Sequence, residues 1–431
     1  MAHSQGYFSM SFILLSTICI INFAIGESKG VDVQEALPGK LKFAHVIFRH
    51  GDRMPVDPYP TDPWNDRKYW PNLWGQLTNR GKQQHYELGK WLRQRYSALL
   101  NATYSREEIY VQSTDVDRTL MSAQANLAGL YEPVGSDVWN KEIKWQPIPV
   151  HSLPEEEDVI LAAKAPCPAY DYAMKNMLES SEMQAMLAKY KELFSYIESN
   201  SGRSIKTFLD AQYINNTMFI ETLYGKALPV WAQKIYGSAD FTDVANFAFA
   251  INTYTRQMAR LKVGPLLKDI LQRMEKKTTK QLKPDRSVYI YSAHDTTVAN
   301  LLNALKLFDV HSPPYVACIL MELRVDDNEK PSVSVYYKNT TAEPQAMDIP
   351  GCGKSCPLNK MFELYQDVLP ANWADECKLS TMAMTYEDAN LGAATGILIV
   401  IIAVLLCVSY GLMIFYRRRN YNFNTPYDEM A

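Results

Sequence analysis

A histidine flanked by two arginines stands in the N-terminal part of the chain. The loop is Arg49-His50-Gly51-Asp52-Arg53-Met54-Pro55, and it directly follows the apolar, strand-like run 41–48. An imidazole nitrogen can attack phosphorus, and guanidinium groups hold phosphate oxygens through charge-assisted, often bidentate hydrogen bonds. These residue types at this spacing therefore indicate phosphoryl transfer, although such a heptad could also form a surface turn with solvated charges.

Two further polar loops follow predicted strands. Segment 113–118, which ends in Arg118, follows the strand 109–112, and Ser292-Ala293-His294-Asp295 follows the strand 287–291. Taken singly, His294 fits a structural histidine, Asp295 a helix N-cap and Arg118 an ordinary ion-pair partner. Taken together, the three loops bring two histidines, three arginines and an aspartate to one sheet edge. Unpaired arginines in one cleft are unfavourable without an anion, so the set predicts a phosphate site.

The elements that must position these loops alternate along the chain. Helical patterns at 81–100, 119–130 and 296–307 follow the three strand–loop units, and a further strand is predicted at 332–337. This order predicts an α/β fold with a mainly parallel central sheet flanked by helices, and ligands of such sheets bind beyond the carboxyl ends of the strands.

A predominantly helical region interrupts this alternation. Helical patterns at 174–196 and 241–274 dominate it, and strand signals are scarce there. We therefore predict a smaller helical cap domain at 170–276, inserted into an α/β catalytic domain that spans 27–169 and 277–377.

Both ends of the chain carry apolar segments. Residues 12–25 predict a signal peptide over 1–26, with Ala24 and Gly26 at the cleavage positions. Residues 391–416 contain no charged side chain and three arginines follow at once, which predicts a transmembrane helix. A polar stalk at 378–390 would precede it and a cytoplasmic tail at 417–431 would follow. The chain is therefore predicted to be a single-pass type I membrane protein with its bulk on the luminal side.

The tail and the overall charge bear on partners. The net charge of −3 over 431 residues gives no argument for nucleic acid or for an anionic membrane surface. Tyr427-Asp428-Glu429-Met430 matches the tyrosine-x-x-bulky-hydrophobic pattern of sorting signals. Tyr427 and Met430 therefore predict binding of a sorting adaptor and a lysosomal or endosomal membrane location, with the plasma membrane as the alternative.

Cysteines and glycosylation sequons agree with export from the cytosol. Outside the signal and the span, the cysteines are Cys167, Cys318, Cys352, Cys356 and Cys377. An odd number in an oxidising compartment leaves at least one thiol free or bonded between chains. Three N-glycosylation sequons fall on the predicted luminal side, and they begin at Asn101, Asn215 and Asn339.

The heptad at 49–55 and the Ser-Ala-His-Asp segment at 292–295 together resemble the two-part signature of the histidine acid phosphatases. The resemblance extends over nearly the whole predicted ectodomain and is specific to the lysosomal and prostatic acid phosphatase branch. It includes the segments 61–63, 76–78, 84–89, 113–123 and 145–151. The membrane span and the sorting tail resemble those of the lysosomal member.

The resemblance implies a phosphoglycerate mutase-like fold and a site for small phosphate monoesters. His50 would be the nucleophile that forms a phosphohistidine, and Asp295 would protonate the leaving alcohol and later help to activate water. The phosphoryl group would be bound by Arg49, Arg53, Arg118 and His294. No metal and no other cofactor is implied, because the arginines and the histidine supply the positive charge.

The resemblance also implies the covalent framework. It pairs Cys167 with Cys377 and Cys352 with Cys356. The usual partner of Cys318 is absent near positions 220–224, so Cys318 is expected to be free.

Other positions match or depart from the family. Trp145 and His151 match dimer contacts, which predicts a homodimer, although Trp145 could equally be a core residue. Gln112 stands where the family usually has an arginine, a change expected to alter the support of the site without removing a phosphate ligand.

Substrate range and activity leave alternatives open. The activity is expected to be highest in acid, because nearby guanidinium groups lower the pKa of His50 while acid favours protonation of Asp295. A phosphatase selective for nucleotides, lysophospholipids or inositol phosphates is one alternative, with an aromatic loop at 59–74 as a selective rim. The same rings could instead pack on a neighbouring helix. The other alternative is a non-catalytic receptor or scaffold ectodomain, against which the presence of both His50 and Asp295 argues.

Overall fold

A six-stranded mixed sheet forms the centre of the fold. The structure is a computed structural model and describes residues 37–379, 401–402 and 404–417. The strand order is β2-β3-β1-β4-β5-β6, and the predicted α/β class is confirmed. The strands are β1 (Lys40–Arg49), β2 (Ile109–Ser113), β3 (Val288–Ala293), β4 (Cys318–Val325), β5 (Pro331–Lys338) and β6 (Cys356–Pro357).

Parallel pairing is confined to the strands that carry the polar loops. β1 and β2 both pair in parallel with the central β3, in a register that sets Arg49 opposite Ala293 and Ser113 opposite Ser292. The three strands therefore end at one edge, and their loops leave the sheet side by side. From β1 onward the pairs are antiparallel, through β4, β5 and β6.

Strand β4 is absent from the sequence-based expectation and makes the sheet mixed. It is buried along Cys318–Leu323, so its apolar run lacks the alternation of a half-exposed strand. This strand joins β5 in an antiparallel pair, which an expectation of a mainly parallel sheet does not include.

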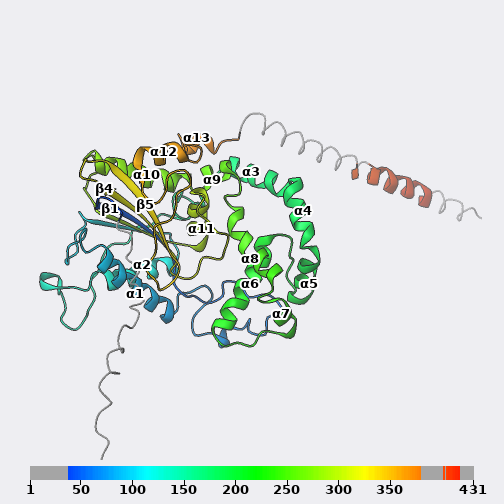
Figure 1. The fold of residues 1–431 in the computed structure, drawn as a ribbon. Helices are drawn as coiled ribbons and strands as arrows, with labels where there is room; N and C mark the ends of the chain where they lie inside the picture. Colours follow the sequence, from blue (N-terminus) through cyan, green and yellow to red (C-terminus); the bar gives the residue numbers. More distant parts are fainter. Residues whose placement is uncertain (1–36, 380–400, 403, 418–431) are drawn as a thin grey trace, which may run out of the picture. The chain divides into compact units, whose positions relative to one another are not determined.

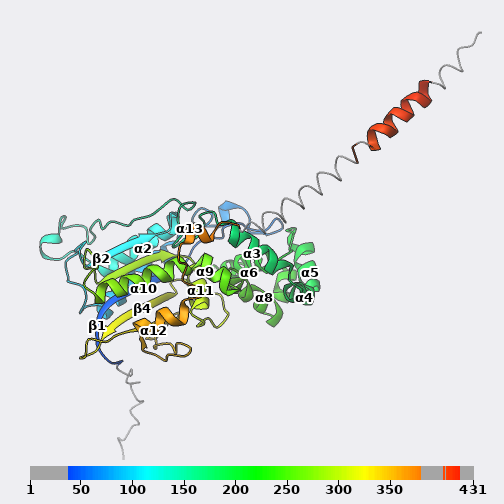
Figure 2. The same ribbon diagram turned by 90° about the horizontal axis from the view of Figure 1, so that it is seen from above.

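Helices cover both faces of the sheet (Figures 1 and 2). α1 (Asn79–Arg95) and α2 (Asp117–Leu130) lie on one face, where His85 of α1 packs against Phe48 of β1. α10, α11 and α12 lie on the other face, where their apolar residues share one core with alternate residues of β1 and β3. Their bounds are Gly264–Thr278, Asp295–Ala304 and Leu358–Tyr365. Because both faces are covered, β1 is buried from Phe43 to Arg49.

A second core lies among the helices between β2 and β3. They are α3 (Pro168–Glu179), α4 (Ser181–Lys189), α5 (Lys191–Ser201), α6 (Phe208–Leu223), α7 (Val230–Ile235), α8 (Ala239–Ile251) and α9 (Arg256–Lys262). This core is centred on residues such as Phe194, Phe208 and Phe241. Figure 1 shows these helices grouped beside the sheet. The division into a catalytic domain and a cap stays a prediction.

The two regions predicted to be helical, 174–196 and 241–274, are each divided into several helices. Region 174–196 comprises α3, α4 and α5, because the Ser180 hydroxyl caps a new helix by accepting from the Met183 N–H. Region 241–274 comprises α8, α9 and α10, and a proline in the first turn of α10 starts the last of these. Three one-turn helices complete the elements of residues 37–379: η1 (Arg67–Tyr69), η2 (Gly135–Asp137) and α13 (Trp373–Glu376).

Both predicted disulfides are formed. Cys167 at the start of α3 is bonded to Cys377, 210 residues away, and Cys352 is bonded to Cys356. Cys318 is buried and free at the start of β4, as predicted.

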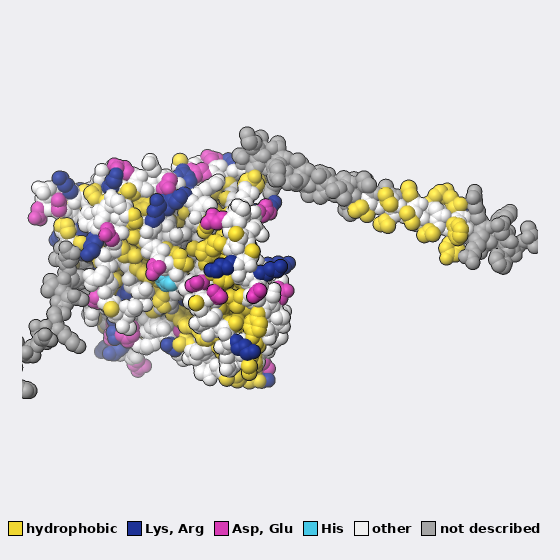
Figure 3. All heavy atoms as spheres, turned by 45° about the vertical axis from the view of Figure 1, so that its right-hand side comes forward, with side chains coloured by type: hydrophobic (Ala, Val, Ile, Leu, Met, Phe, Trp, Pro, Cys, Tyr) yellow, Lys and Arg dark blue, Asp and Glu magenta, His cyan; other side chains and the backbone are white. Residues whose placement is uncertain are grey.

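The ends of the chain are described only in part. Residues 404–417 are helical, with exposed hydrophobic side chains that Figure 3 shows in yellow. Within the described ranges, no helix has both the length and the apolar character needed to cross a membrane. The predicted span at 391–416 lies partly outside those ranges. The predicted signal peptide, most of the stalk, and Tyr427 and Met430 lie wholly outside them.

Candidate active site

The three loops at the parallel edge surround a cavity of about 440 Å³. The predicted site residues in its wall are His50, Arg53, Arg118, His294 and Asp295. Arg49, the sixth predicted residue, is 4% exposed and lies behind the wall. The structure therefore brings the whole predicted set together, because β1, β2 and β3 end at the same level.

His50 is held in a defined tautomer. Its Nδ1 atom is 2.8 Å from the carbonyl oxygen of Gly51, and a carbonyl can only accept, so Nδ1 carries the proton. The lone pair is then on Nε2, the nitrogen free to attack phosphorus. Burial lowers the pKa of His50 well below its usual value, and the charges of Arg49, Arg118 and Arg53 lower it further. His50 consequently stays an uncharged nucleophile in acid.

Arg49 fixes Asp295 at the start of α11. Its Nη2 is 2.9 Å from Asp295 Oδ2, its Nη1 donates to the carbonyl of Pro313, and its guanidinium lies 4.4 Å from the ring centre of Tyr315. Burial alone would raise the pKa of Asp295, but the charges of Arg49, Arg53 and His294 outweigh burial and lower it. Taken singly, Asp295 fits an N-cap, but the cap position belongs to His294 and Asp295 is the first helical residue.

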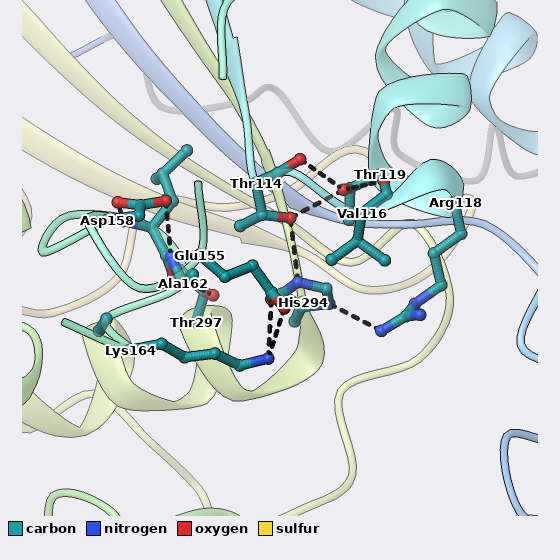
Figure 4. A network of polar contacts seen from close by, with 12 residues as sticks. Thr114, Val116, Arg118, Thr119, Glu155, Asp158, Ala162, Lys164, His294 and Thr297 are labelled. Carbon is teal, nitrogen blue, oxygen red and sulfur yellow. Dashed lines mark hydrogen bonds and ion pairs between the residues drawn. The ribbon is translucent and has the colours of Figure 1, made fainter. Parts of the chain in front are cut away.

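His294 lies between a hydroxyl and a guanidinium (Figure 4). Its Nε2 is 3.0 Å from Thr114 Oγ1, and its Nδ1 is 3.4 Å from Arg118 Nη2. Because the guanidinium can only donate, Nδ1 accepts and the proton of the neutral ring is on Nε2. Burial and then the charge of Arg118 lower the pKa of His294. Thr114 belongs to the segment 113–118 but was not singled out from the sequence.

The arginines keep donors without partners. The Nε atoms of Arg49, Arg53 and Arg118 are buried and have no hydrogen-bond partner among the described residues. Burial, followed by the charge of Arg53, lowers the pKa of Arg118 to about 10. Buried unpaired guanidinium donors are costly, so the site is built for an anion that accepts from them.

Helix α6 supplies a residue that sequence reasoning missed. Arg53 Nη2 donates to Asn216 Oδ1 at 3.0 Å, which directs the guanidinium along the cavity wall. Gln212 and Tyr213 of the same helix also line the cavity. Asn216 is the middle residue of the sequon at Asn215, but nothing in the sequence links that position to the heptad.

A loop with many internal hydrogen bonds contributes Glu155, Ala162 and Lys164 to the cavity wall near His294. Both carboxylate oxygens of Glu155 accept from Lys164 Nζ, at 2.7 and 2.9 Å (Figure 4). The Asp158 carboxylate caps the loop by accepting from three backbone N–H groups, those of Ile160, Leu161 and Ala162. This part of the cavity wall therefore carries one negative and one positive charge that pair with each other, and hydrogen bonds to Asp158 hold its backbone.

The aromatic loop, the predicted dimer contacts and two of the predicted glycosylation sites lie outside the wall of this cavity, as does the third sequon's first residue. Trp70 is 4% exposed and packs on Met54 and Ile220, so the aromatic loop packs against α6 and does not line the cavity. Trp145 is 38% exposed and His151 is exposed, so Trp145 is not a core residue. The homodimer stays a prediction, as does glycosylation, for which Asn101 and Asn339 are exposed and Asn215 is half-buried in α6.

Two glycines allow the nucleophile loop to touch α1, which leads to a prediction. A Cβ at Gly51 would lie 2.4 Å from the Gly81 carbonyl oxygen, and a Cβ at Gly81 would lie 2.3 Å from that of Asp52. We expect Gly51→Ala to cost about 2 kcal/mol or more of unfolding free energy and to lower kcat/KM, because the loop holding His50 must move. Thermal unfolding and steady-state kinetics measure both effects. Gly237→Ala meets no atom within 4 Å but stands at φ +80°, so it should lose some stability and retain kcat/KM. Unchanged activity in Gly51→Ala would contradict the close-packing argument.

Comparison with known proteins identifies the family. The description "Histidine phosphatase superfamily (branch 2)" matches residues 40–338. The lysosomal acid phosphatase of Xenopus laevis is 38% identical over 379 residues, 86% of this chain and 86% of that relative. The prostatic acid phosphatase of Homo sapiens is 37% identical over 362 residues, 83% of this chain and 93% of the relative.

Solved structures share the fold at lower identity. A Hafnia alvei phytase in complex with tartrate has a TM-score of 0.61 and 18% identity, covering 80% of this chain and 100% of its own. A Citrobacter braakii phytase has a TM-score of 0.58 and 19% identity, covering 79% and 100%. These likenesses concern the fold alone. The match over residues 40–338 and the relatives more than a third identical decide the family: the chain belongs to branch 2 of the histidine phosphatase superfamily.

Proposed function

We propose that the protein is an acid phosphatase that hydrolyses small phosphate monoesters through a phosphohistidine on His50. The observation that carries this proposal is the free Nε2 of His50 in a cavity lined by Arg53 and Arg118, with Arg49 directly behind its wall, all three of which keep unpaired Nε donors. Relatives named lysosomal and prostatic acid phosphatase support the same activity. The proposal needs no metal, since the arginines neutralise the charge of the phosphoryl group.

The proposed reaction has two steps. His50 Nε2 forms a bond to phosphorus while the ester P–O bond breaks, and the leaving oxygen takes a proton from Asp295. Water then attacks phosphorus with Asp295 as the base, the P–N bond breaks, and inorganic phosphate leaves.

Asp295 is ionised in the unliganded site, because Arg49 lies beside it. A phosphate monoester has a second pKa of about 6, so the monoanion that prevails in acid brings a proton. Transfer of that proton to Asp295 would leave the acid ready to protonate the leaving oxygen. The acidic optimum then has two causes: the substrate carries a proton in acid, and the lowered pKa of His50 keeps the nucleophile uncharged there.

The first test is hydrolysis of p-nitrophenyl phosphate by the full chain from pH 3.5 to 8, with and without EDTA. We expect a maximum in acid, because the lowered pKa of His50 keeps the nucleophile free there while the monoanion declines above pH ~6. EDTA should not reduce the rate. A maximum at or above neutral pH would contradict the proposal. Folded protein without activity would favour the receptor or scaffold interpretation.

We also propose a lysosomal or endosomal membrane location, with a signal peptide at 1–26, a single type I span at 391–416 and the catalytic part in the lumen. Relatives named lysosomal acid phosphatase support the compartment. The charge-free segment followed by three arginines supports the span. The homodimer through the surface of Trp145 and His151, and the glycans at Asn101, Asn215 and Asn339, belong to the same proposal.

Sorting is proposed to depend on the tail. Tyr427→Ala should divert the full chain from lysosomes to the cell surface, because an adaptor would no longer recognise the tyrosine and the hydrophobic residue at 430. Surface biotinylation and co-localisation with a lysosomal marker measure the shift, and Tyr421→Ala is a matched control in the same tail. Unchanged lysosomal delivery of Tyr427→Ala would remove this part of the proposal.

A further inference from the structure

Two carboxyl groups, those of Asp62 and Glu221, interact in the interior between α6 and the chain that follows the heptad. Glu221, in the last turn of α6, is 0% exposed, and Asp62 is 3% exposed. Asp62 belongs to a tight turn, in which its N–H donates to the Tyr59 carbonyl at 3.0 Å and its Oδ1 accepts from the Trp64 N–H at 2.7 Å. Neither carboxyl belongs to the proposed reaction, and neither lines the cavity of the site.

The pair has no cation to neutralise it within the described residues. Both oxygens of Glu221 and Oδ2 of Asp62 have no hydrogen-bond partner there, and the buried hydroxyl of Tyr59 beside them has none either. Apart from burial, the pKa values of the pair respond to the other carboxyl and to the Trp64 N–H, and both carboxyls in turn raise the pKa of Tyr59. Lys226 follows α6 but stacks over the Trp64 ring, 4.9 Å from its centre. Two buried carboxylates without a cation would be very unfavourable.

One proton resolves this problem. Two carboxylates are both acceptors, so they can hydrogen-bond to each other only when one is protonated. Burial, and then the charge of Asp62, raise the pKa of Glu221 to about 9. Burial also raises the pKa of Asp62. The pair therefore keeps a shared proton through the acidic and neutral range.

Within the described residues, three polar side-chain contacts link the end of α6 to the chain around the phosphate-binding loop, beside the apolar packing of Ile220 on Met54. Arg53 Nη2 donates to Asn216 Oδ1 at 3.0 Å, and the Tyr224 hydroxyl donates to Asp52 Oδ2 at 2.5 Å. The third link joins Glu221 to the turn at Asp62, ten residues after Asp52 along the chain. Only the third requires a proton that a carboxyl has to retain.

We propose that the proton shared by Asp62 and Glu221 docks α6 against the loop that carries Arg53, so that these two acids position Arg53 and Asn216 for the phosphoryl group. Loss of the proton places two negative charges in the interior and loosens α6 from the loop. The two residues are positioning residues, because neither touches the substrate. The positioning role rests on the proposed phosphatase function, whereas the proton-dependent docking does not.

The sign of the pH effect follows from linkage. A glutamate has an ordinary pKa of about 4.3 when unfolded and a raised one here, so between these values the folded protein holds the extra proton. This contribution to stability is fully present below pH ~4 and is lost as the pH rises towards 9. The pair thus favours the folded site in acid, which suits an acidic compartment.

The test compares the full chain with Glu221→Gln from pH 4.5 to 9. The amide donates to the Asp62 carboxylate without titrating, so the variant mimics the protonated pair. Without substrate, the Tm of the variant relative to that of the wild type should rise with pH. The folding equilibrium constant of the wild type falls by up to about tenfold per pH unit in this range, because its folded state holds one proton more than its unfolded state. Parallel Tm curves would overturn the shared proton, whatever the enzyme's activity. If Glu221→Gln does not fold, Asp62→Asn makes the same comparison.

Inhibition by inorganic phosphate at 25 °C tests the positioning role. The ratio of Ki, wild type over Glu221→Gln, should rise roughly tenfold between pH 5 and 9, the effect of weakening one charge-assisted hydrogen bond. Titration of phosphate itself cancels in this ratio. A constant ratio with diverging Tm curves would refute positioning and leave only a stability effect.

Glu322→Gln is the matched control for these measurements. Glu322 is likewise 0% exposed, but it is paired with Arg95 at 2.7 Å and accepts from the Tyr96 hydroxyl at 3.1 Å. Glu322→Gln should lower Tm over the whole pH range, and its Tm should not rise relative to the wild type at high pH. A gain at high pH in this control as well would show that the effect is not specific to the pair.

Discussion

Replacement of His50 by Ala is expected to lower kcat/KM for p-nitrophenyl phosphate by at least about 10⁴-fold, because the attacking atom is removed. No other ionisable nitrogen in the cavity wall is suited to replace it, and Lys164 Nζ is an ammonium paired with Glu155. The ring nitrogens of His294 are occupied by Thr114 and Arg118, and guanidinium groups carry no lone pair for attack. The residual rate would come from binding and charge stabilisation alone.

A trapped intermediate makes this prediction sharper. Rapid quenching of the wild type with ³²P-labelled substrate should yield protein-bound phosphate that is labile to acid and stable to alkali, and His50→Ala should yield none. Peptide mapping should place the label on His50. Label on another residue, or a variant that keeps a tenth of the activity, would contradict the proposed nucleophile.

A folded control is needed because His50 is 2% exposed. His151→Ala removes an exposed imidazole that stacks on Tyr110, with ring centres 4.7 Å apart, far along the chain from the heptad. It should retain kcat/KM. Thermal unfolding of both variants then separates loss of chemistry from loss of structure.

The buried histidines and the acid pair oppose each other in their effect on stability. Burial lowers the pKa of His45, His50 and His85, so these rings are neutral when folded and gain protons on unfolding in acid. Their contribution to stability decreases as the pH falls below ~6.5. The proton shared by Glu221 and Asp62 acts in the opposite direction. On this proposal, the stability that the neutral buried histidines lose in acid is offset by the stability that the pair of Glu221 and Asp62 retains there.

The site was predictable from sequence to the extent that local order along the chain determines it. Each predicted residue lies at the end of a strand or within five residues after it, and parallel strands end at one edge. Short-range pattern was therefore enough to group His50, Arg118 and His294. Asn216 and Tyr315 could not be found in this way. They come from a helix and a loop remote in sequence, and only tertiary packing brings them to Arg53 and Arg49.

The fold shows the same division. The α/β class and the edge of the site followed from alternating strands and helices, whereas β4 did not, because a fully buried strand shows no periodicity. The interruptions at Ser180 and at Val263 were missed for a different reason. Helical periodicity continues across a cap when the next helix packs on the same core, so a break leaves little trace in the apolar pattern.

Asp295→Asn is expected to lower kcat by about 10²- to 10⁴-fold for alkyl phosphates, and by much less for p-nitrophenyl phosphate. An alkoxide needs a proton to leave, whereas p-nitrophenolate is stable without one. Phosphorylation of His50 should therefore remain fast with the aryl ester. Hydrolysis of the phosphohistidine should become slow, because water has lost its base.

Burst kinetics with p-nitrophenyl phosphate distinguish these steps. The variant should release one equivalent of p-nitrophenol rapidly and then turn over slowly, with phosphohistidine accumulating. The substitution also removes the carboxylate that pairs with Arg49 at 2.9 Å. It removes no arginine, so inorganic phosphate should still bind. Asp117→Asn, an exposed carboxyl next to Arg118, is the control and should change kcat less than about threefold. Equal losses for alkyl and aryl esters would show that Asp295 does not protonate the leaving group. Its role would then be to hold Arg49, and another group would have to be found for the proton.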